Sequence, residues 1–260
     1  MSDATRPPLS DRPFTLATDL DGTFLGGSQA ARRALYDWIE AHRDTVGLIF
    51  VSGRDPEFIT GMVRDGLPRP DFVVGDVGTT IAEVATDARV APIAALEAEI
   101  AKLWGDSGEA VRKALDGHPG LTLQPTRFRY RVSYDMDPGA LSPDSAAAVR
   151  AMGLDVLTSD DRFFDVLPPG VSKGPSLRRL IAHLGVPETR VLAAGDTLND
   201  LSMLVCGVPA VAVGGSEAAL LTQVAGHERV HKAGAVGAAG IAEAIAALDL
   251  HPTPPEVIHG

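Results

Sequence analysis

Residues 14–23 read FTLATDLDGT, an apolar run that leads directly into two closely spaced carboxylates. The run Phe14–Thr18 predicts a buried strand. In an open parallel sheet, ligands bind beyond the carboxyl ends of the strands, which is where Asp19 and Asp21 fall. Residues i and i+2 of an extended chain project to the same side, and Gly22 lets the backbone turn sharply. Two such carboxylates repel each other and need a cation or a shared proton. The stretch therefore predicts a reaction centre at a strand end, although an Asp-Gly turn after a strand is the plain structural alternative.

Apolar runs alternate with amphipathic stretches on both sides of this segment. Asp55 is a plausible N-cap, with Pro56 at the first position of the helix that follows. The remaining expected strands are 46–51, 71–74, 190–194, 208–213 and a weak one at 228–231, and the expected helices are 30–42, 173–184, 198–204, 217–224 and 236–248. Strand–helix alternation of this kind predicts an α/β fold, with a parallel sheet covered by helices on both faces.

The middle of the chain breaks this alternation. It has two helical stretches, then strand candidates at 121–124 and 128–136, a helix at 143–152, and strand candidates at 154–158 and 163–166. Hairpins with helices on one side describe an α+β module. We therefore expect a core domain at residues 1–82 and 168–260, interrupted by an inserted domain at residues 83–167.

Three further polar groups follow apolar runs. The segment GDTLND at 195–200 gathers oxygen-bearing side chains suited to a hard cation such as Mg²⁺. Ser52 and nearby backbone N–H groups could hold a phosphate at a helix N-terminus. Lys173 opens a helix, where the helix dipole does not stabilise a lysine, and it would neutralise phosphate charge. Each group alone also suits a structural role, as a turn, a helix cap or a solvated lysine.

Composition narrows the possible partners and setting. The chain has 260 residues, 23 Lys and Arg against 34 Asp and Glu, and a formal net charge of −11. An acidic surface repels nucleic acid and anionic lipid, so we expect neither nucleic acid nor a membrane as a partner. Cys206 is the only cysteine, which fits a reducing cytoplasm. Residues 1–13 lack the apolar core of a signal peptide, so we expect a cytoplasmic protein. The scattered histidines do not suggest zinc.

In order and content, DLDGT at 19–23, Ser52, Lys173 and GDTLND at 195–200 resemble the four motifs of the haloacid dehalogenase superfamily of phosphohydrolases. The resemblance implies a Rossmann-like core and Mg²⁺ as the cofactor. Asp19 would be the nucleophile and a metal ligand. Asp21 would offer its backbone carbonyl to the metal and its carboxyl as general acid and base. Asp196 would bind the metal, and Asp200 with Asn199 would act as a ligand or a neighbouring support.

The insertion lies between the third strand and the Lys173 helix, a placement that resembles the large-cap (Cof, type IIB) branch of this superfamily. The strings LPRPDFVVGDVGTTI, RYRVSYD and DVLPPGVSKGPSLRRL resemble its sucrose-phosphate phosphatase group, whose related members act on mannosyl- or glucosyl-linked phosphates. Arg131 stands where sucrose phosphatases commonly carry a lysine, so the resemblance does not specify sucrose phosphate.

The cap strand at 128–136 alternates in character, with Arg127, Arg129 and Arg131 on one side. One or more of these arginines could reach an anionic sugar phosphate, and a solvated sheet face is the alternative. Asp165 is a second candidate contact at the cap edge, with a surface carboxylate as the alternative. Gly78 and Thr79 follow the third strand, where a hinge or substrate loop is expected.

The candidate residues fall into three groups. The predicted catalytic residues are Asp19, Asp21, Ser52 and Lys173; the predicted metal ligands are Asp19, Asp21, Asp196 and Asp200; and the predicted substrate-binding residues are Thr23, Ser52, Gly53, Arg54, Gly78, Thr79, Arg131, Asp165, Lys173 and Asn199.

Three functions remain open from the sequence. The first is a Mg²⁺-dependent phosphatase acting on a small phosphorylated sugar or sugar conjugate through an aspartyl-phosphate. The alternative is a phosphosugar mutase with the same intermediate. The third is a phospho-acceptor switch, which Asp21 disfavours because an acid/base carboxyl promotes turnover.

Overall fold

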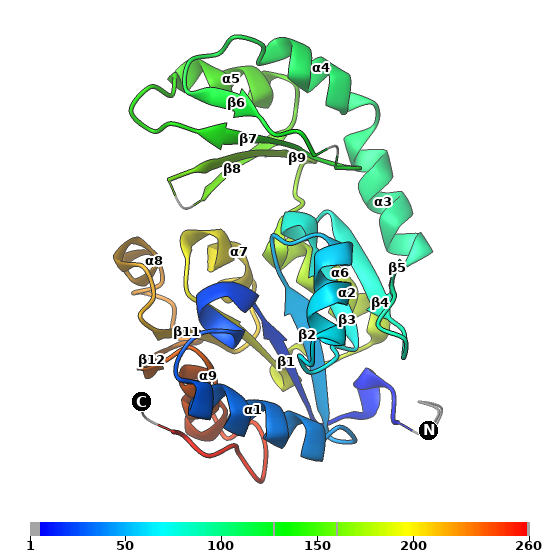
Figure 1. The fold of residues 1–260 in the computed structure, drawn as a ribbon, viewed down its shortest axis with the longest axis vertical. Coiled ribbons are helices and arrows are strands. Elements are labelled where there is room, and N and C mark those ends of the chain that lie inside the picture. The colour runs from blue at the N-terminus through cyan, green and yellow to red at the C-terminus, as the bar shows by residue number, and fades with distance from the viewer. Residues whose placement is uncertain (1–5, 127, 160, 259–260) are drawn as a thin grey trace. The chain divides into compact units, whose positions relative to one another are not determined.

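The structure is a computed structural model that describes residues 6–126, 128–159 and 161–258. The chain forms two compact units (Figure 1). The first unit runs from the N-terminal segment to Ile93 and resumes at Lys173, and the second unit is Ala94–Ser172. The chain therefore leaves the first unit once and returns to it at a predicted catalytic residue.

The first unit is built on one sheet. Its described strands are β1 (Phe14–Thr18), β2 (Val46–Val51), β3 (Phe72–Gly75), β4 (Thr80–Val84), β5 (Val90–Pro92), β10 (Val191–Gly195), β11 (Ala210–Gly214) and β12 (Val230–Val236). They lie in the order β12-β11-β10-β1-β2-β3-β4-β5, and the strands from β12 to β3 are parallel. The predicted α/β class is confirmed.

Burial on both faces explains why these strands are apolar throughout. Every residue of β1 and of β2 is buried, as expected of central strands in a parallel sheet with helices on both sides. Thr18 pairs with Phe50 of β2 and with Ala194 of β10. This register brings the carboxyl ends of the three strands to the same edge of the sheet.

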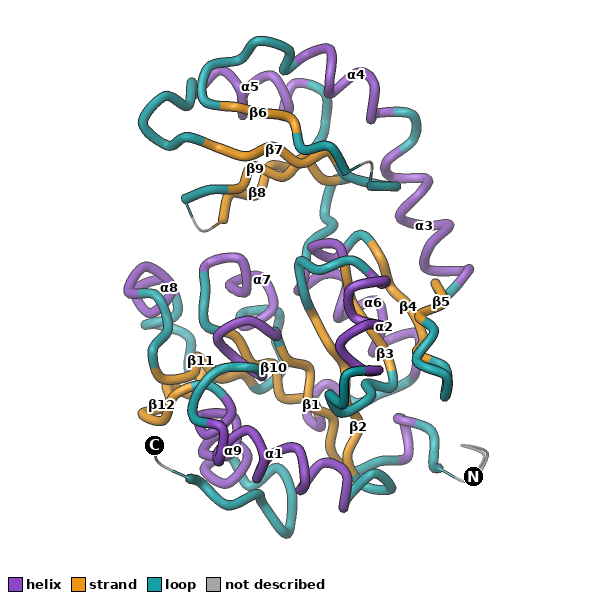
Figure 2. The backbone as a smooth tube through the Cα atoms, in the orientation of Figure 1, coloured by secondary structure: helices purple, strands orange, loops and turns teal. Residues whose placement is uncertain are grey.

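Helices cover the sheet (Figure 2). They are α1 (Gln29–Ala41), α2 (Pro56–Arg64), α6 (Lys173–Leu184), α7 (Leu201–Leu204), α8 (Ala218–Gln223) and α9 (Ala238–Ala247), with 3-10 turns at Leu9–Asp11, Asp76–Gly78, Glu188–Arg190 and Leu198–Asp200. The predicted N-cap residue of α2 is confirmed, since the Asp55 side chain accepts a hydrogen bond from the Phe58 N–H at 2.9 Å. Among the described residues, no helix has the length and apolar character needed to cross a bilayer.

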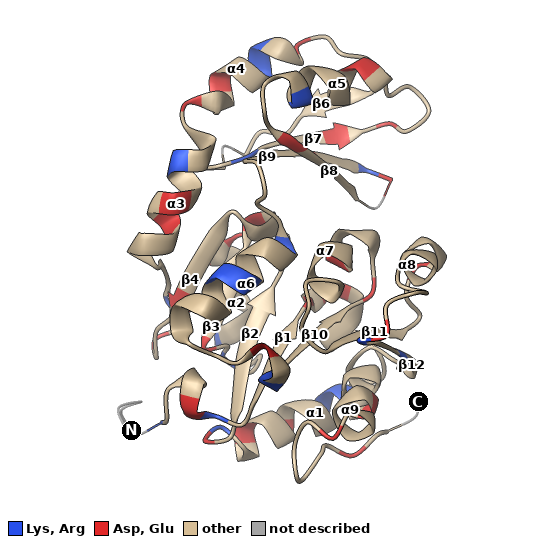
Figure 3. Cartoon of the chain, turned by 180° about the vertical axis from the view of Figure 1, so that it is seen from behind, with Lys and Arg blue, Asp and Glu red and all other residues tan. Residues whose placement is uncertain are grey.

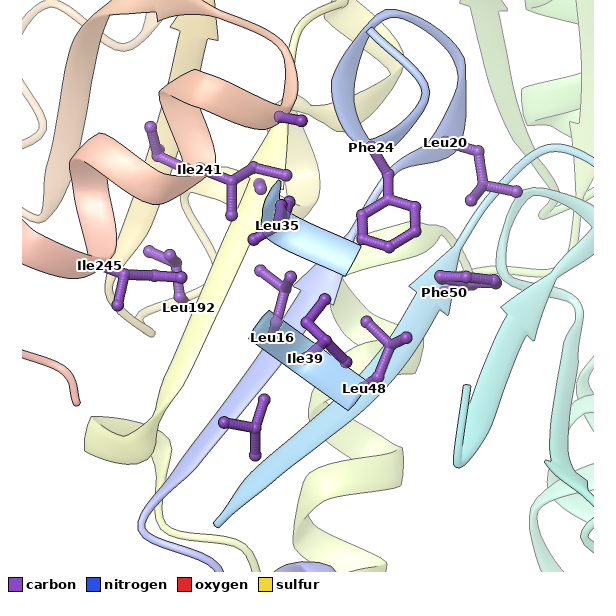
Figure 4. Close-up of a cluster of buried hydrophobic side chains, with 14 of the residues drawn as sticks. Leu16, Leu20, Phe24, Leu35, Ile39, Leu48, Phe50, Leu192, Ile241 and Ile245 are labelled. Atoms are coloured by element: carbon purple, nitrogen blue, oxygen red, sulfur yellow. The ribbon is translucent and has the colours of Figure 1, made fainter. Parts of the chain in front are cut away.

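The core of the first unit lies between one face of the sheet and the helices α1 and α9, which contact each other (Figure 4). Leu16, Leu48 and Leu192 of the strands pack in one cluster with Leu35 of α1 and Ile241 of α9, and each is 1% exposed or less. Burying one such side chain contributes about 1.5–3 kcal/mol. The cluster therefore holds β1, which leads to Asp19, against two helices.

The second unit has its own sheet and core. Its described strands β6 (Leu121–Leu123), β7 (Val132–Met136), β9 (Phe163–Leu167) and β8 (Asp155–Ser159) form an antiparallel sheet in that order. Its helices are α3 (Ala94–Trp104), α4 (Ser107–Ala114) and α5 (Pro143–Ala151). Trp104, Tyr134, Phe164 and Val149 belong to its apolar cluster. On its surface, α3 carries charges of both signs (Figure 3).

The structure differs from several of the expected boundaries, most of all around the second unit. The second unit begins at Ala94 rather than at residue 83, because β4 and β5 extend the first sheet as antiparallel edge strands. It ends at Ser172 rather than at residue 167. The strand expected from residue 128 begins at Val132, where its pairing with β9 starts, and before it Arg129 pairs with Glu97. Arg127 lies outside the described residues.

Candidate active site

Three strand ends and one helix start supply the candidate site of the first unit. Asp19 follows β1, Ser52 follows β2, Asp196 follows β10, and Lys173 is the first residue of α6. The N–H of Asp19 donates to the Ala194 carbonyl at 2.9 Å, which extends the β1–β10 ladder by one residue. The sheet therefore fixes the backbone of Asp19 directly.

The turn Leu20–Phe24 brings a second segment close to Asp196. Gly22 has φ of +78°, and a Cβ at this position would lie 2.1 Å from Asp196 Oδ2. Only glycine satisfies both the backbone angle and the close approach. Next to it, Thr23 Oγ1 donates to Asp196 Oδ1 at 2.6 Å. The DLDGT string thus places Asp19 and Asp196 in one cluster.

Lys173 lies at the centre of the candidate site, and its side chain is 1% exposed. Its Nζ donates to Asp19 Oδ1, to Asn199 Oδ1 and to Asp200 Oδ1, each at 2.7 Å. These contacts use the three donors of an ammonium group. Burial opposes the charged form, but the charges of Asp19 and Asp200 outweigh it and raise the pKa of Lys173 above its ordinary value. Both the contacts and the raised pKa therefore favour the charged form of the buried Lys173 side chain.

Asp200 shapes the loop that carries Asp196. It is fully buried, and its Oδ2 accepts from the N–H of Asp196 at 3.0 Å and from that of Thr197 at 3.1 Å. Gly195 permits this closeness, because a Cβ there would lie 2.5 Å from the Asp200 Cβ. Asp200 thus uses one oxygen to hold the loop and the other to hold Lys173.

Asp19, Asp196 and Asp200 could together hold a metal ion. One carboxylate oxygen from each lies within 4.8 Å of the other two. Burial raises the pKa of Asp19 to about 8, despite Lys173 and with a contribution from Asp200. Burial likewise raises the pKa of Asp196 to about 6. These carboxylates have too little positive charge nearby, and a hard divalent cation would supply it through the oxygen ligands that such ions prefer. The donor set therefore fits Mg²⁺.

Asp21 has a different partner. Its carboxylate accepts from Arg54 Nε at 3.0 Å and from Arg54 Nη2 at 3.1 Å. The guanidinium lies over the Phe58 ring, 4.3 Å from its centroid. The Asp21 side chain is 61% exposed, so solvent can reach it. The predicted metal contact of Asp21 uses its backbone carbonyl and stays a prediction.

Ser52 and the loop after β3 lie at the carboxyl ends of their strands, and both contact the backbone of Arg54. Ser52 is 1% exposed, and its Oγ accepts from the Arg54 N–H at 3.2 Å. The Asp76 N–H donates to the Arg54 carbonyl at 3.0 Å. Asp76 and Val77 adopt positive φ values of 51° and 60°, a conformation that aspartate tolerates but that is costly for the β-branched Val77. This strained turn therefore supports the Ser52–Arg54 loop.

Gly78 and Thr79 belong to that turn. The Gly78 carbonyl accepts from Ser176 Oγ of α6 at 2.7 Å, and the Thr79 N–H donates to the Asp76 carbonyl at 3.2 Å. The first of these contacts ties the turn to the helix that begins at Lys173, and the second closes the turn itself. The predicted substrate roles of Gly53, Gly78 and Thr79 stay predictions.

In the second unit, Arg131 and Asp165 lie together. Arg131 Nη1 donates to Asp165 Oδ1 at 3.0 Å, and both residues are buried. The Ser133 hydroxyl donates to the same oxygen, and the Arg131 guanidinium lies 3.6 Å from the Phe128 ring centroid. The two residues were expected as separate substrate contacts, whereas in the structure they form an ion pair with each other. Their substrate role stays a prediction.

Sequence reasoning missed Glu217. Its N–H donates to the Asp196 carbonyl at 2.9 Å, and its Oε2 accepts from the Leu198 N–H at 2.8 Å. Glu217 follows β11, the strand beside β10, so it holds the Asp196 loop from the next strand over. A glutamate is common at the start of a helix, so its presence there did not indicate a contact with the Asp196 loop.

Comparison with known proteins shows which sequences this chain resembles. Residues 12–249 match the family model of sucrose-6F-phosphate phosphohydrolase. The chain is 41% identical over 232 residues to a glucosylglycerol-phosphate synthase of Pseudomonas anguilliseptica, a match that covers 88% of this chain and 30% of that protein. It is 29% identical over 197 residues to the mannosylfructose-phosphate phosphatase of Agrobacterium fabrum, covering 72% of this chain and 77% of the relative.

The fold is also similar to a solved structure. The sucrose-phosphatase of Synechocystis, in complex with sucrose and phosphate, superposes with a TM-score of 0.82 at 24% identity, covering 92% of this chain and 98% of that one. At this level of identity the likeness concerns the fold. The chain spans less than a third of the length of the synthase it matches at 41% identity.

Proposed function

The chain belongs to the sucrose-6F-phosphate phosphohydrolase family, in the haloacid dehalogenase superfamily, and from this premise we propose that it is a Mg²⁺-dependent phosphatase of a phosphorylated sugar or sugar conjugate. The observation that carries the proposal is the contact of buried Lys173 with both Asp19 and Asp200. A cation fixed between a strand-end carboxylate and a metal-binding loop suits the transfer of an anionic phosphoryl group.

In the first half-reaction, Asp19 attacks the phosphorus atom of the substrate. Lys173 holds Asp19 Oδ1, so Oδ2 is the oxygen left to attack. The new bond joins this oxygen to phosphorus, and the bond from phosphorus to the sugar oxygen breaks. For this step the Asp21 carboxyl must carry a proton, so one of its two contacts with Arg54 opens, and Asp21 gives that proton to the leaving sugar oxygen. The products are the free sugar alcohol and an aspartyl-phosphate.

In the second half-reaction, Asp21, now a carboxylate, takes a proton from a water molecule. The water oxygen bonds to phosphorus, the bond to Asp19 breaks, and inorganic phosphate leaves. Asp19 returns as a carboxylate and Asp21 returns protonated. The exposure of the Asp21 side chain supports this role, because the group must meet both a leaving alcohol and a water.

Asp19, Asp196 and Asp200 would hold Mg²⁺. When bound, the ion would neutralise charge shared between the nucleophile and the transferring phosphoryl oxygens. Lys173 fixes Asn199 as well as Asp200, so the loop that carries these residues stays in place.

The relatives support a sugar conjugate as the substrate. Their names refer to glucosylglycerol phosphate and mannosylfructose phosphate, in which a sugar is joined to a second hydroxyl compound. The phosphatase names among the relatives also favour hydrolysis over the phosphosugar mutase that the sequence left open. Arg131 and Asp165 remain our candidate cap contacts to the sugar.

The proposal is tested by measuring phosphate release across a panel of phosphorylated sugars and sugar conjugates, with and without Mg²⁺. Wild type should release phosphate from at least one member only when Mg²⁺ is present. Asp19→Asn should be inactive, and Asp37→Asn, at an exposed position of α1, should match wild type. No Mg²⁺-dependent release from any member would sink the proposal.

A further inference from the structure

Helix α1 contacts the turn that carries Asp21 through the side chain of Tyr36. The Tyr36 hydroxyl donates to the Phe24 carbonyl at 2.8 Å, at the end of the turn Leu20–Phe24. The two rings are stacked, with centroids 4.6 Å apart and planes at 30°. Phe24 is fully buried and also packs on Phe50 of β2, at 5.2 Å between centroids. Tyr36 thus fixes both the backbone and the side chain of Phe24.

One helical turn earlier, Arg32 holds the next part of the same segment. Its Nη1 donates to the Leu25 carbonyl at 3.2 Å and to the Gly27 carbonyl at 2.7 Å. Residues four apart lie on one face of a helix, so Arg32 and Tyr36 act from the same side. Together they donate to three carbonyls of the chain that follows Asp21.

The start of α9 closes the other side of this segment. The Ala238 N–H donates to the Gly26 carbonyl at 3.2 Å. A Cβ on Gly237 would lie 2.2 Å from the carbonyl carbon of Gly26, so the two backbones leave no room between them. Movement of residues 24–27 would therefore require α1 or α9 to move as well. Because the turn is short, fixing its far end limits where Asp21 can lie relative to Asp19.

We propose that Tyr36 and Arg32 are positioning residues for the general acid, holding the DLDGT turn so that Asp21 can reach the leaving oxygen of the substrate. Neither residue contacts the reacting groups. Their effect passes through the Phe24, Leu25 and Gly27 carbonyls to the backbone of the turn. Burial raises the pKa of Tyr36 to about 12, so its hydroxyl keeps the proton that it donates. This inference rests on the proposed phosphatase function.

The test compares two substrates by kcat/KM, which covers the steps up to release of the alcohol. One is the sugar phosphate that wild type hydrolyses best, whose alkoxide needs a proton to leave. The other is p-nitrophenyl phosphate, whose phenolate leaves without one. Tyr36→Phe removes only the hydroxyl. It should lower kcat/KM for the sugar phosphate about five-fold, as expected from the loss of roughly 1 kcal/mol of orientation, and leave that for the aryl phosphate within about two-fold of wild type.

Further variants control for folding and for loss of a hydroxyl in general. Tyr134→Phe removes a buried hydroxyl that has no hydrogen-bond partner within the described part of the chain and should change neither value. Arg32→Gln should reproduce the substrate-dependent loss, and Arg32→Lys, which keeps a cation that can reach a carbonyl, should recover part of it. Melting temperatures confirm that each variant is folded under the assay conditions.

An unchanged kcat/KM for both substrates in Tyr36→Phe and Arg32→Gln would overturn the proposal. An equal loss for both substrates would overturn it too, because the residues would then act on attack by Asp19 or on stability. If wild type hydrolyses neither substrate with Mg²⁺ present, the proposed function fails, which is a separate result.

Discussion

The guanidinium of Arg54 donates to both carboxylate oxygens of Asp21, from Nε at 3.0 Å and from Nη2 at 3.1 Å. The fork of Arg matches a carboxylate in this way, whereas Lys offers a single point charge. Both side chains are partly exposed, at 43% and 61%, so the pair contributes at most about 1 kcal/mol to stability. Its larger consequence is the orientation of the proposed general acid.

Replacing this fork is therefore expected to affect catalysis more than folding. Arg54→Lys should lower kcat/KM for the sugar phosphate about ten-fold, because Asp21 loses its two-point orientation, while the melting temperature changes by about 2 °C or less. The control is Arg64→Lys, at an exposed position near the end of α2. Unchanged kinetics in Arg54→Lys would mean that Asp21 is aimed by something else.

Separating the two half-reactions tests the roles of the carboxylates. Asp21→Asn keeps the nucleophile but removes the acid and base. With an aryl phosphate it should form the aspartyl-phosphate and then turn over at least about 100-fold more slowly than wild type. Rapid-quench trapping of phosphate on the protein measures this directly. Turnover equal to wild type would refute the role given to Asp21.

Lys173 should contribute to stability as well as to chemistry. Lys173→Met removes the only ammonium that contacts Asp19, Asn199 and Asp200 among the described residues. Leaving buried carboxylates uncompensated costs about 3–5 kcal/mol, which corresponds to a melting temperature lower by roughly 6–20 °C.

Mg²⁺ should recover part of that loss, because an ion held by the folded carboxylates would replace part of the missing positive charge. Thermal melts with and without Mg²⁺ measure both effects. Lys232→Met, at an exposed lysine, is the matched control. If Lys173→Met melts like wild type without Mg²⁺, the carboxylate cluster does not depend on Lys173 for its charge balance.

Gly22 should tolerate no side chain. Gly22→Ala places a methyl group 2.1 Å from Asp196 Oδ2 at a φ of +78°, so the turn or the Asp196 loop must shift. Positive φ alone costs about 1–2 kcal/mol for a residue other than glycine. We expect weaker Mg²⁺ activation and a loss of activity of about 100-fold, measured as phosphate release against Mg²⁺ concentration. Gly61→Ala on α2, where an added Cβ meets nothing within 4 Å, should stay active.

His251 predicts a pH dependence of stability away from the site. Burial lowers its pKa, and the nearby His42 adds to this. Its ring packs on Trp38, and its Nε2 lies 3.0 Å from Thr45 Oγ1. The unfolded chain therefore takes up this proton at a higher pH than the folded chain does. The stability linked to His251 is present above the ordinary histidine pKa of about 6.5, and it is lost as the pH falls through that value towards the lower folded pKa.

The measurement is the melting temperature between about pH 7.5 and about pH 5. His251→Phe, which keeps a ring against Trp38, should show a smaller fall than wild type. His183→Gln, at an exposed histidine, should fall as wild type does. Parallel curves for wild type and His251→Phe would remove His251 as a cause.

Local patterns predicted the elements that carry the site. Phe14–Thr18, Val46–Val51 and Lys173–Leu184 begin and end where the sequence indicated, because their runs of apolar residues or their helical spacing end at polar or glycine residues. Membership of the superfamily and of its sugar-phosphatase branch is confirmed. In the second unit, the strand start at Val132 was missed, since pairing with the distant strand β9 begins there and no local pattern records where such a partner starts.

The partners within the site were beyond such reasoning. Arg54 was expected to bind substrate, and its pairing with Asp21 joins residues 33 positions apart. Arg131 and Asp165, 34 positions apart, form an ion pair because β7 lies beside β9. Sequence patterns indicate which residue types follow a strand, but the register between distant strands decides which of them meet.

The parts of the candidate site are also synthesised at different times, because they lie far apart in the sequence. Asp19 and Lys173 are 154 positions apart, and β1 lies between early β2 and late β10. While a ribosome is still synthesising residues 94–172, β1 has a neighbour on one side only, and Asp19 has neither Lys173 nor the loop at residues 195–200 beside it. Such long-range contacts form slowly. The candidate site can therefore be assembled only after the whole inserted unit has been synthesised, so a chain truncated within that unit would expose β1 as an open sheet edge and would lack the lysine and the loop that meet Asp19.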